Sequence, residues 1–291
     1  MRINTNISAM NTYSRLSSAN TAKSSSLAKL SSGLRINKAG DDAAGLSISE
    51  KMKNQISGLT QATRNAQDGI SLIQTAEGAL NETHSILNRM RDLSVQAANG
   101  TNEDSDRSAI QKELTELVDE LDNIANKTRF NGTELLNGGA NNVTLQIGAN
   151  QGDTLTLNIG DMQPGALGLD ENKDGTVDKL ISKINFDKAD QQDASDYITD
   201  PSDAISVIDA AISQVSAERS NLGAKQNRLE HTINNLTTTK ENLSEANSRI
   251  RDVDMAEEMM EFTKSNILSQ AATSMLAQAN QMPQGVLQLL G

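Results

Sequence analysis

The sequence predicts a mainly α-helical protein, built as a long antiparallel helical bundle or coiled coil with a small β-hairpin. Three observations predict this class. A seven-residue apolar repeat runs through the last third of the chain, and the glycines gather in one central region where the apolar pattern changes to period two. Leu, Ile, Val and Phe make up only about 21% of the 291 residues, which is too little for a thick globular core.

Residues 1–44 are expected to form a helix followed by a glycine-punctuated connector. The first forty residues hold six basic and no acidic side chains, a composition that also occurs in organelle transit peptides. The helical pattern is diluted by serines, so its apolar side chains are few. Its candidate packing residues are Ile3, Ile7, Met10, Leu27, Leu30 and Leu34.

Residues 45–160 should contain two bundle helices and the hairpin. One apolar seam runs from Ile73 to Met90, and a second steps by four and three from Ile110 to Ile124. Beyond them, the alternating segments 143–147 and 155–159 predict two strands joined by a short turn.

Residues 161–200 are rich in polar residues, Gly and Asp, and are expected to be a short variable loop or appendage. The run from Asp170 to Gly175 matches the first half of a calcium-binding loop, with Asp170, Asn172, Asp174 and Asp178 as weak candidate ligands. Ile181 stands where the loop needs a bidentate Glu, so a polar surface turn is the simpler interpretation.

Residues 201–254 predict one long helix that starts at Pro201. One of its two heptad positions is apolar throughout, which gives a continuous bundle seam. That seam consists of Ile208, Val215, Leu222, Leu229, Leu236, Leu243 and Ile250.

Residues 255–291 predict a terminal helix whose last 27 residues, from Ser265 onward, carry no charge. Such a segment needs a cover, and its Gln and Asn side chains exclude lipid, so the natural cover is another helix. With few apolar side chains of their own, both termini are expected to become ordered only on binding a partner. The candidate packing residues here are Leu268, Met275, Met282, Leu287 and Leu290.

Composition and motifs argue against several functions. A formal charge of −12 disfavours nucleic-acid binding, and no apolar run is long enough for a membrane insertion. There is no Cys, and His84 and His231 lack partners at catalytic or metal-ligand spacing. We therefore expect no enzyme activity, no catalytic residue and no cofactor.

Both ends of the chain resemble one family. Leu30-Ser31-Ser32-Gly33-Leu34-Arg35-Ile36 and the run from Ala39 to Glu50 closely resemble the N-terminal signature of bacterial flagellin, in its short form typical of Gram-positive rods. Three later segments are similar to the C-terminal signature of the same family. They are 227–230 (NRLE), 248–256 (SRIRDVDMA) and 275–280 (MLAQAN).

The resemblance implies a structural subunit that self-assembles into the helical flagellar filament for motility, with its terminal helices paired in the filament core and folding on polymerisation. It also implies secretion through the flagellar type III export apparatus, an export chaperone, and contact with the filament cap and hook-junction proteins. Host receptors are implied too. Arg89, Leu93 and Glu113 match the positions that flagellins present to a Toll-like receptor, and Leu287, Leu289 and Leu290 match the C-terminal leucines read by a cytosolic receptor.

Two other interpretations remain open at this point. A regulatory coiled-coil adaptor with a cleaved basic leader would show the same heptads, and it would keep its partner after loss of the first forty residues. A calcium-dependent secreted enzyme would use the acidic loop, although no nucleophile or base is visible. Chelation would reduce its activity or stability.

Overall fold

The computed structural model describes residues 6–169, 179–186 and 198–290, with the side chains of the last helix described as far as residue 281. The chain divides into two compact units. Unit 1 comprises Met1–Ser57 and Thr239–Gly291, and unit 2 comprises Gly58–Thr238. The division falls within the two longest helices, α2 (Ala43–Ala97) and α4 (Pro201–Arg251).

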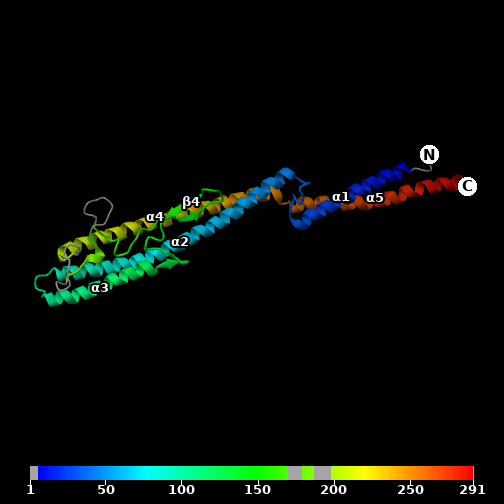
Figure 1. Cartoon of the computed structure of the whole chain (residues 1–291). Coiled ribbons are helices and arrows are strands. Elements are labelled where there is room, and N and C mark those ends of the chain that lie inside the picture. Colours follow the sequence, from blue (N-terminus) through cyan, green and yellow to red (C-terminus); the bar gives the residue numbers. More distant parts are fainter. Residues whose placement is uncertain (1–5, 170–178, 187–197, 291) are drawn as a thin grey trace. The chain divides into compact units, whose positions relative to one another are not determined.

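Unit 1 is formed by the two terminal helices together with the start of α2 and the end of α4 (Figure 1). Helix α1 (Ile7–Ser32) begins where the side chain of Asn6 accepts a hydrogen bond from a backbone N–H one turn ahead. It ends at Gly33, whose φ of 71° lies in the left-handed region that glycine adopts without strain. Helix α5 (Met255–Leu290) lies beside it.

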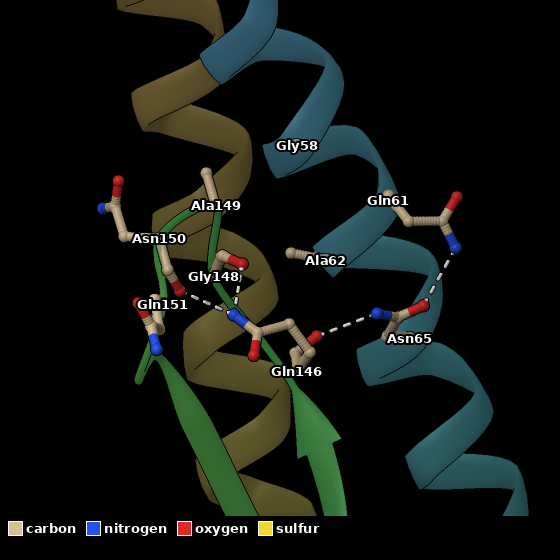
Figure 2. Close-up of a pocket in the computed structure, with 9 residues that line it drawn as sticks. All are labelled: Gly58, Gln61, Ala62, Asn65, Gln146, Gly148, Ala149, Asn150 and Gln151. Atoms are coloured by element: carbon tan, nitrogen blue, oxygen red, sulfur yellow. Dashed lines mark hydrogen bonds between the residues drawn. The ribbon is translucent and has the colours of Figure 1, made fainter.

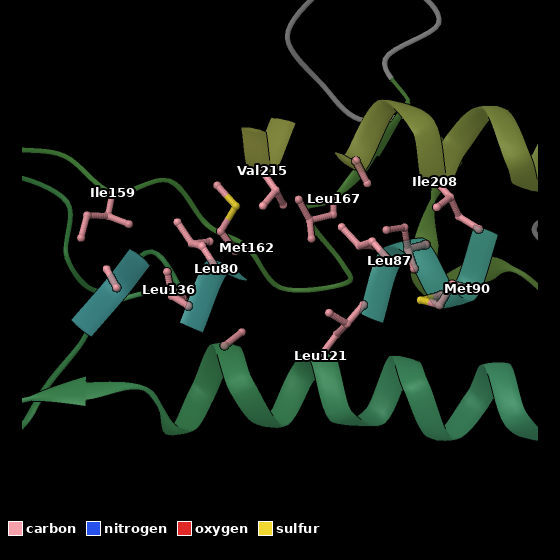
Figure 3. Packing of buried hydrophobic residues seen from close by; sticks show 14 of the residues in the cluster. Leu80, Leu87, Met90, Leu121, Leu136, Ile159, Met162, Leu167, Ile208 and Val215 are labelled. Atoms are coloured by element: carbon pink, nitrogen blue, oxygen red, sulfur yellow. The ribbon is translucent and has the colours of Figure 1, made fainter. Parts of the chain in front are cut away.

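Unit 2 is a bundle of α2, α4 and α3 (Asp104–Lys127) with the apolar core between them (Figure 3). The predicted seams meet in this core, where α2 contributes Leu80, Leu87 and Met90 and α3 contributes Leu121. The helices and their seams are thus confirmed. From the predicted heptad of α4, Ile208, Val215, Leu222, Leu229 and Leu236 are buried, whereas Leu243 and Ile250 are half-buried.

The predicted hairpin is confirmed as an antiparallel pair. Strand β3 (Val143–Gln146) pairs with β4 (Thr154–Leu157), with Leu145 opposite Leu155. Two shorter pairs accompany it: β1 (Arg129–Phe130) with β2 (Thr133–Glu134), and β5 (Gly168–Leu169) with β6 (Lys179–Leu180). A short 3-10 turn, η1 (Ile181–Lys183), follows β6.

The described parts of residues 161–200, expected to be a short variable loop or appendage, contain regular structure. They form β5, β6 and η1, and they place several side chains in the bundle core. Leu167, Ile181, Ile184, Phe186 and Ile198 are buried there. These side chains lie in short segments without a regular apolar repeat, so no periodicity marks them.

The tip of the hairpin lies directly against α2 (Figure 2). The amide of Asn65 donates to the carbonyl of Gln146 over 2.9 Å, and Gln146 in turn donates to the carbonyls of Gly148 and Asn150. A Cβ at Gly58 would stand 3.0 Å from the Cβ of Ala149. The close approach of the tip therefore depends on the glycine.

We expect Gly58→Leu to displace the hairpin tip, because the added side chain would occupy the space of Ala149. Amide hydrogen exchange of Ile147, whose N–H donates to Asp153 in the turn, should become at least about tenfold faster. Gly78→Leu is the matched control, since a Cβ at this position of the same helix meets nothing within 4 Å. Equal exchange in the two variants would contradict the assignment.

Candidate assembly surface

The terminal helices α1 and α5 pair through polar contacts spread along their length. The amide of Asn6 donates to the carbonyl of Ala279 over 2.7 Å, and Lys23 donates to Asn266 over 2.9 Å. Nearer the other end, Lys29 and Glu258 are 3.5 Å apart. Low residue numbers meet high ones throughout, so the two helices are antiparallel, and the start of α1 lies beside the last part of α5 (Figure 1).

Unit 1 has almost no hydrophobic core. Among its described residues, only Ile36 and Ala279 are buried apolar side chains. The other buried positions of the helix pair are small and polar, Ser26 on α1 and Ser265 on α5. Small side chains permit close approach of the helices, but they remove little apolar surface from water.

Most of the large apolar side chains of α1 and α5 instead face outward. Twelve large apolar side chains are exposed among the described residues, and eleven of them belong to unit 1. We call the ten that lie on α1 and α5 the terminal apolar face. It consists of Ile7, Met10, Tyr13, Leu27, Met255, Met259, Met260, Ile267, Leu268 and Met275.

A groove of about 780 Å³ lies between the two terminal helices. Ser and Ala side chains of α1 form one wall, and α5 supplies Leu268 and Met275 from the terminal apolar face. Arg15, Glu261 and Lys264 stand among the lining residues. An apolar surface framed by charges is typical of a protein-binding site rather than of a lipid contact.

In unit 1, the connector between α1 and α2 is hydrogen-bonded to the junction between α4 and α5. The N–H of Val253 donates to the carbonyl of Gly33 over 3.1 Å, and the N–H of Arg35 donates to the carbonyl of Arg251 over 2.6 Å. The guanidinium of Arg251 also pairs with Glu50 at 2.8 Å. The connector and the α4–α5 junction are thereby held as one structure.

Asp41 orders the connector before α2. Its carboxylate accepts hydrogen bonds from the backbone N–H groups of Lys38 and Asn37, which hold the pKa of Asp41 below its ordinary value. A lowered carboxyl pKa means that this contribution to stability is present above the unfolded pKa. It is lost as the pH falls through the folded pKa.

We expect the amide resonance of Lys38 to shift as the pH falls through the lowered pKa of Asp41, because protonation of Asp41 removes the acceptor charge. In Asp41→Asn the titration should vanish while the amide of Lys38 keeps a neutral acceptor. NMR titration of the full chain measures both. A Lys38 shift that titrates identically in the variant would contradict the assignment.

The structure brings many of the predicted packing residues to the outside. Ile7, Met10, Leu27, Leu268 and Met275 are exposed in the single chain, and Leu30 and Leu34 are half-buried. Ile3 lies outside the described residues, as do the side chains of Met282, Leu287, Leu289 and Leu290.

Part of the terminal apolar face was not predicted. The five members that the sequence analysis did not name are Tyr13, Met255, Met259, Met260 and Ile267. Ile267 directly precedes Leu268, and Met260 stands seven residues before Ile267, so a second stripe at helical spacing was present as a signal.

The predicted Toll-like receptor positions lie in unit 2. Arg89 and Glu113 are exposed and form an ion pair of 2.6 Å between α2 and α3. Leu93 is only 2% exposed and belongs to the core of the single chain, and a receptor contact through its side chain stays a prediction. Leu93 follows Met90 by three residues, which turns it to the flank of the buried seam.

The weak calcium candidates Asp170, Asn172, Asp174 and Asp178 lie outside the described residues. Within the described ranges, no three His, Asp or Glu side chains come together as a metal site. Among the same residues, no helix is both long and apolar enough to cross a membrane.

A helical bundle whose terminal helices display an apolar face that the chain does not cover is typical of a self-assembling structural subunit. The sequence matches the model of the bacterial flagellin N-terminal helical region over residues 3–141 and that of the C-terminal helical region over residues 205–290. The chain belongs to the bacterial flagellin family and is a subunit of the flagellar filament.

Two relatives place the chain within that family, and one solved structure has a similar fold. It is 57% identical over 306 aligned positions to flagellin of Bacillus subtilis (strain 168), and 52% identical over 290 to flagellin of Halalkalibacterium halodurans. Each match covers the whole of both chains. The structure of a putative flagellar hook-associated protein from Vibrio parahaemolyticus, 17% identical, covers 73% of this chain and 100% of its own, with a TM-score of 0.58, which shows a similar fold.

These matches confirm the resemblance to the Gram-positive type. They also bear on the adaptor interpretation. The first forty residues fall within the matched N-terminal region almost completely, so they belong to the part of the chain that the family shares.

Proposed function

We propose that the terminal apolar face is the surface through which filament subunits pack, and that α1 and α5 become stably ordered only when other copies cover it. The observation that carries this proposal is the distribution of apolar side chains. Unit 2 buries most of its large apolar side chains, whereas α1 and α5 leave most of their described ones exposed. A second copy of the same chain, present at high density in a filament, supplies the missing cover.

The polymer geometry follows from how the faces meet. Identical subunits that meet through unlike faces form an open helix when the rotation from one subunit to the next does not close into a ring. Each added subunit covers part of the terminal apolar face of its neighbour, so binding free energy stabilises the helical termini by mass action. The residues from Ile3 to Leu34 and from Leu268 to Leu290 named above form this assembly core, in ranges 1–44 and 255–291.

Further partners are proposed from the family. Before assembly, an export chaperone would cover the uncharged end of α5, and the chain would leave the cell through the type III export apparatus to an extracellular filament. Cap and hook-junction proteins would contact its terminal helices. The chain would act as a structural subunit without catalytic activity.

Host receptors complete the proposed partners. Arg89 and Glu113 remain candidates for a Toll-like receptor contact, because both are exposed in the single chain. Leu287, Leu289 and Leu290 remain candidates for the cytosolic receptor.

Electron microscopy of the purified full chain after seeding with filament fragments tests the assembly proposal. We expect long tubes in which both termini resist added protease, whereas the dilute chain is cleaved first within α1 and α5. A chain that stays unpolymerised under all seeding conditions, or whose termini are cleaved equally in tubes, would overturn the proposal.

A further inference from the structure

The sulfur chemistry of this chain is concentrated on one surface. The sequence has ten Met and no Cys, so methionine is its only oxidisable sulfur. Of the eight methionines whose side chains the structure describes, five are exposed, and all five belong to the terminal apolar face. They are Met10, Met255, Met259, Met260 and Met275.

The methionines of unit 2 are protected. Met90 is 0% and Met162 is 7% exposed, and both belong to the bundle core. By contrast, Met260 is 68% and Met275 is 62% exposed. A small oxidant therefore reaches the exposed sulfur atoms of unit 1 before the buried ones of unit 2. Unfolding of the terminal helices would increase this difference in access.

The exposed sulfurs stand among the side chains that the proposed function assigns to subunit packing. Met275 lines the groove between α1 and α5 together with Leu268. Met260 lies one heptad before Ile267 on α5, and both are exposed. Conversion of these thioethers to sulfoxides would place polar groups on a surface that must lose water when it packs.

We propose that the five exposed methionines form an oxidation-sensitive site that controls assembly, with hydrogen peroxide as the class of oxidant. This inference rests on the proposed function. In the free chain the site is open, and peroxide turns the chain into one that does not polymerise. In the filament the neighbouring subunits cover the same sulfurs, so assembled subunits resist oxidation.

The chemical step is an oxygen transfer. A lone pair of the methionine sulfur attacks one peroxide oxygen, the O–O bond breaks, and an S–O bond forms. The sulfur is oxidised by two electrons to the sulfoxide, while the peroxide is reduced and leaves as water after proton transfer. The product is polar and chiral, and methionine sulfoxide reductases can reverse it.

The first experiment maps oxidation without any reference to assembly. The full-length free chain is treated with hydrogen peroxide and the sulfoxides are located by peptide mass spectrometry over time. We expect the five exposed methionines to react at least about tenfold faster than Met90 and Met162. Equal rates in the two groups would overturn the proposal. Preassembled filaments should lose this difference, because the five sites become protected.

The second experiment measures seeded polymerisation of oxidised and untreated chain. We expect the oxidised chain to polymerise at least about tenfold more slowly and sulfoxide reductase to restore the rate. A variant with all five methionines replaced by Leu should polymerise at a rate that peroxide does not change. A variant with the five replaced by Gln should polymerise as slowly as the oxidised chain. If the Leu variant fails to assemble, the test is whether sulfoxide reductase restores polymerisation of the oxidised native chain. Restoration supports the proposal, and its absence contradicts it.

The outcomes separate the two proposals. Failure of the untreated chain to polymerise contradicts the proposed function. Normal polymerisation of a chain shown to be oxidised at all five positions contradicts only the oxidation-sensitive site.

Discussion

Leu268→Asp is expected to abolish seeded polymerisation while leaving the bundle of unit 2 intact. Leu268 is 52% exposed in the single chain and lines the groove of the terminal apolar face. In a packed filament the new carboxylate would be buried without a partner, at a cost of several kcal/mol per subunit. We therefore expect the critical concentration for assembly to rise roughly a hundredfold or more.

Sedimentation of seeded samples over a range of concentrations gives this critical concentration directly. Leu268→Met is the matched control, because it keeps the volume and apolar character and should change the value by less than about threefold. Thermal unfolding of unit 2 should be identical in both variants, since Leu268 lies in unit 1. Normal assembly of Leu268→Asp would remove Leu268 from the packing surface.

Leu114→Ala is expected to destabilise the bundle strongly. Leu114 is 1% exposed on α3 and packs in the core of unit 2. Removal of its side chain leaves a cavity among helices that cannot close fully on it, so the free energy of unfolding should fall by about 3 kcal/mol. Chemical denaturation followed by circular dichroism measures this loss.

Leu117→Ala provides the comparison on the same helix. Leu117 is half-buried and only flanks the core, so the same substitution should cost about 1 kcal/mol. A similar loss for both variants would mean that the seam of α3 is not buried on one side as described. Neither variant touches the terminal apolar face, so assembly below the unfolding midpoint should persist.

The helices and the main hairpin could be predicted because regular periods mark them. Ile208 to Leu236 repeat every seven residues, and Val143 to Leu157 alternate about a central turn, so each pattern identifies both the element and its buried side. When a whole face of an element is apolar, the spacing of its residues is enough to predict the element and its buried side.

Other parts of the fold could not be read in this way. Phe186 and Ile198 enter the core from irregular segments, where a single apolar residue has no repeat to reveal its direction. Leu93 shows the reverse problem, since a motif match gives its position but not that its side chain turns into the bundle. Burial at such sites depends on contacts between distant parts of the sequence.

The terminal helices could be predicted only in part. Their uncharged and apolar stretches indicated a surface that needs a cover, and Met10, Leu268 and Met275 are indeed uncovered in the single chain. The regular polar contacts between α1 and α5, such as that of Asn6 with Ala279, had no signal in the sequence because single Asn or Lys residues are common on any helix.

Hydrogen–deuterium exchange of the full chain, compared between dilute solution and the filament, tests the central claim most directly. In the free chain we expect slow exchange in α3 and in the parts of α2 and α4 that belong to unit 2, and fast exchange throughout α1 and α5. In the filament α1 and α5 should become protected as well. Terminal helices that are equally protected in both states would contradict the claim that other copies of the chain complete their packing.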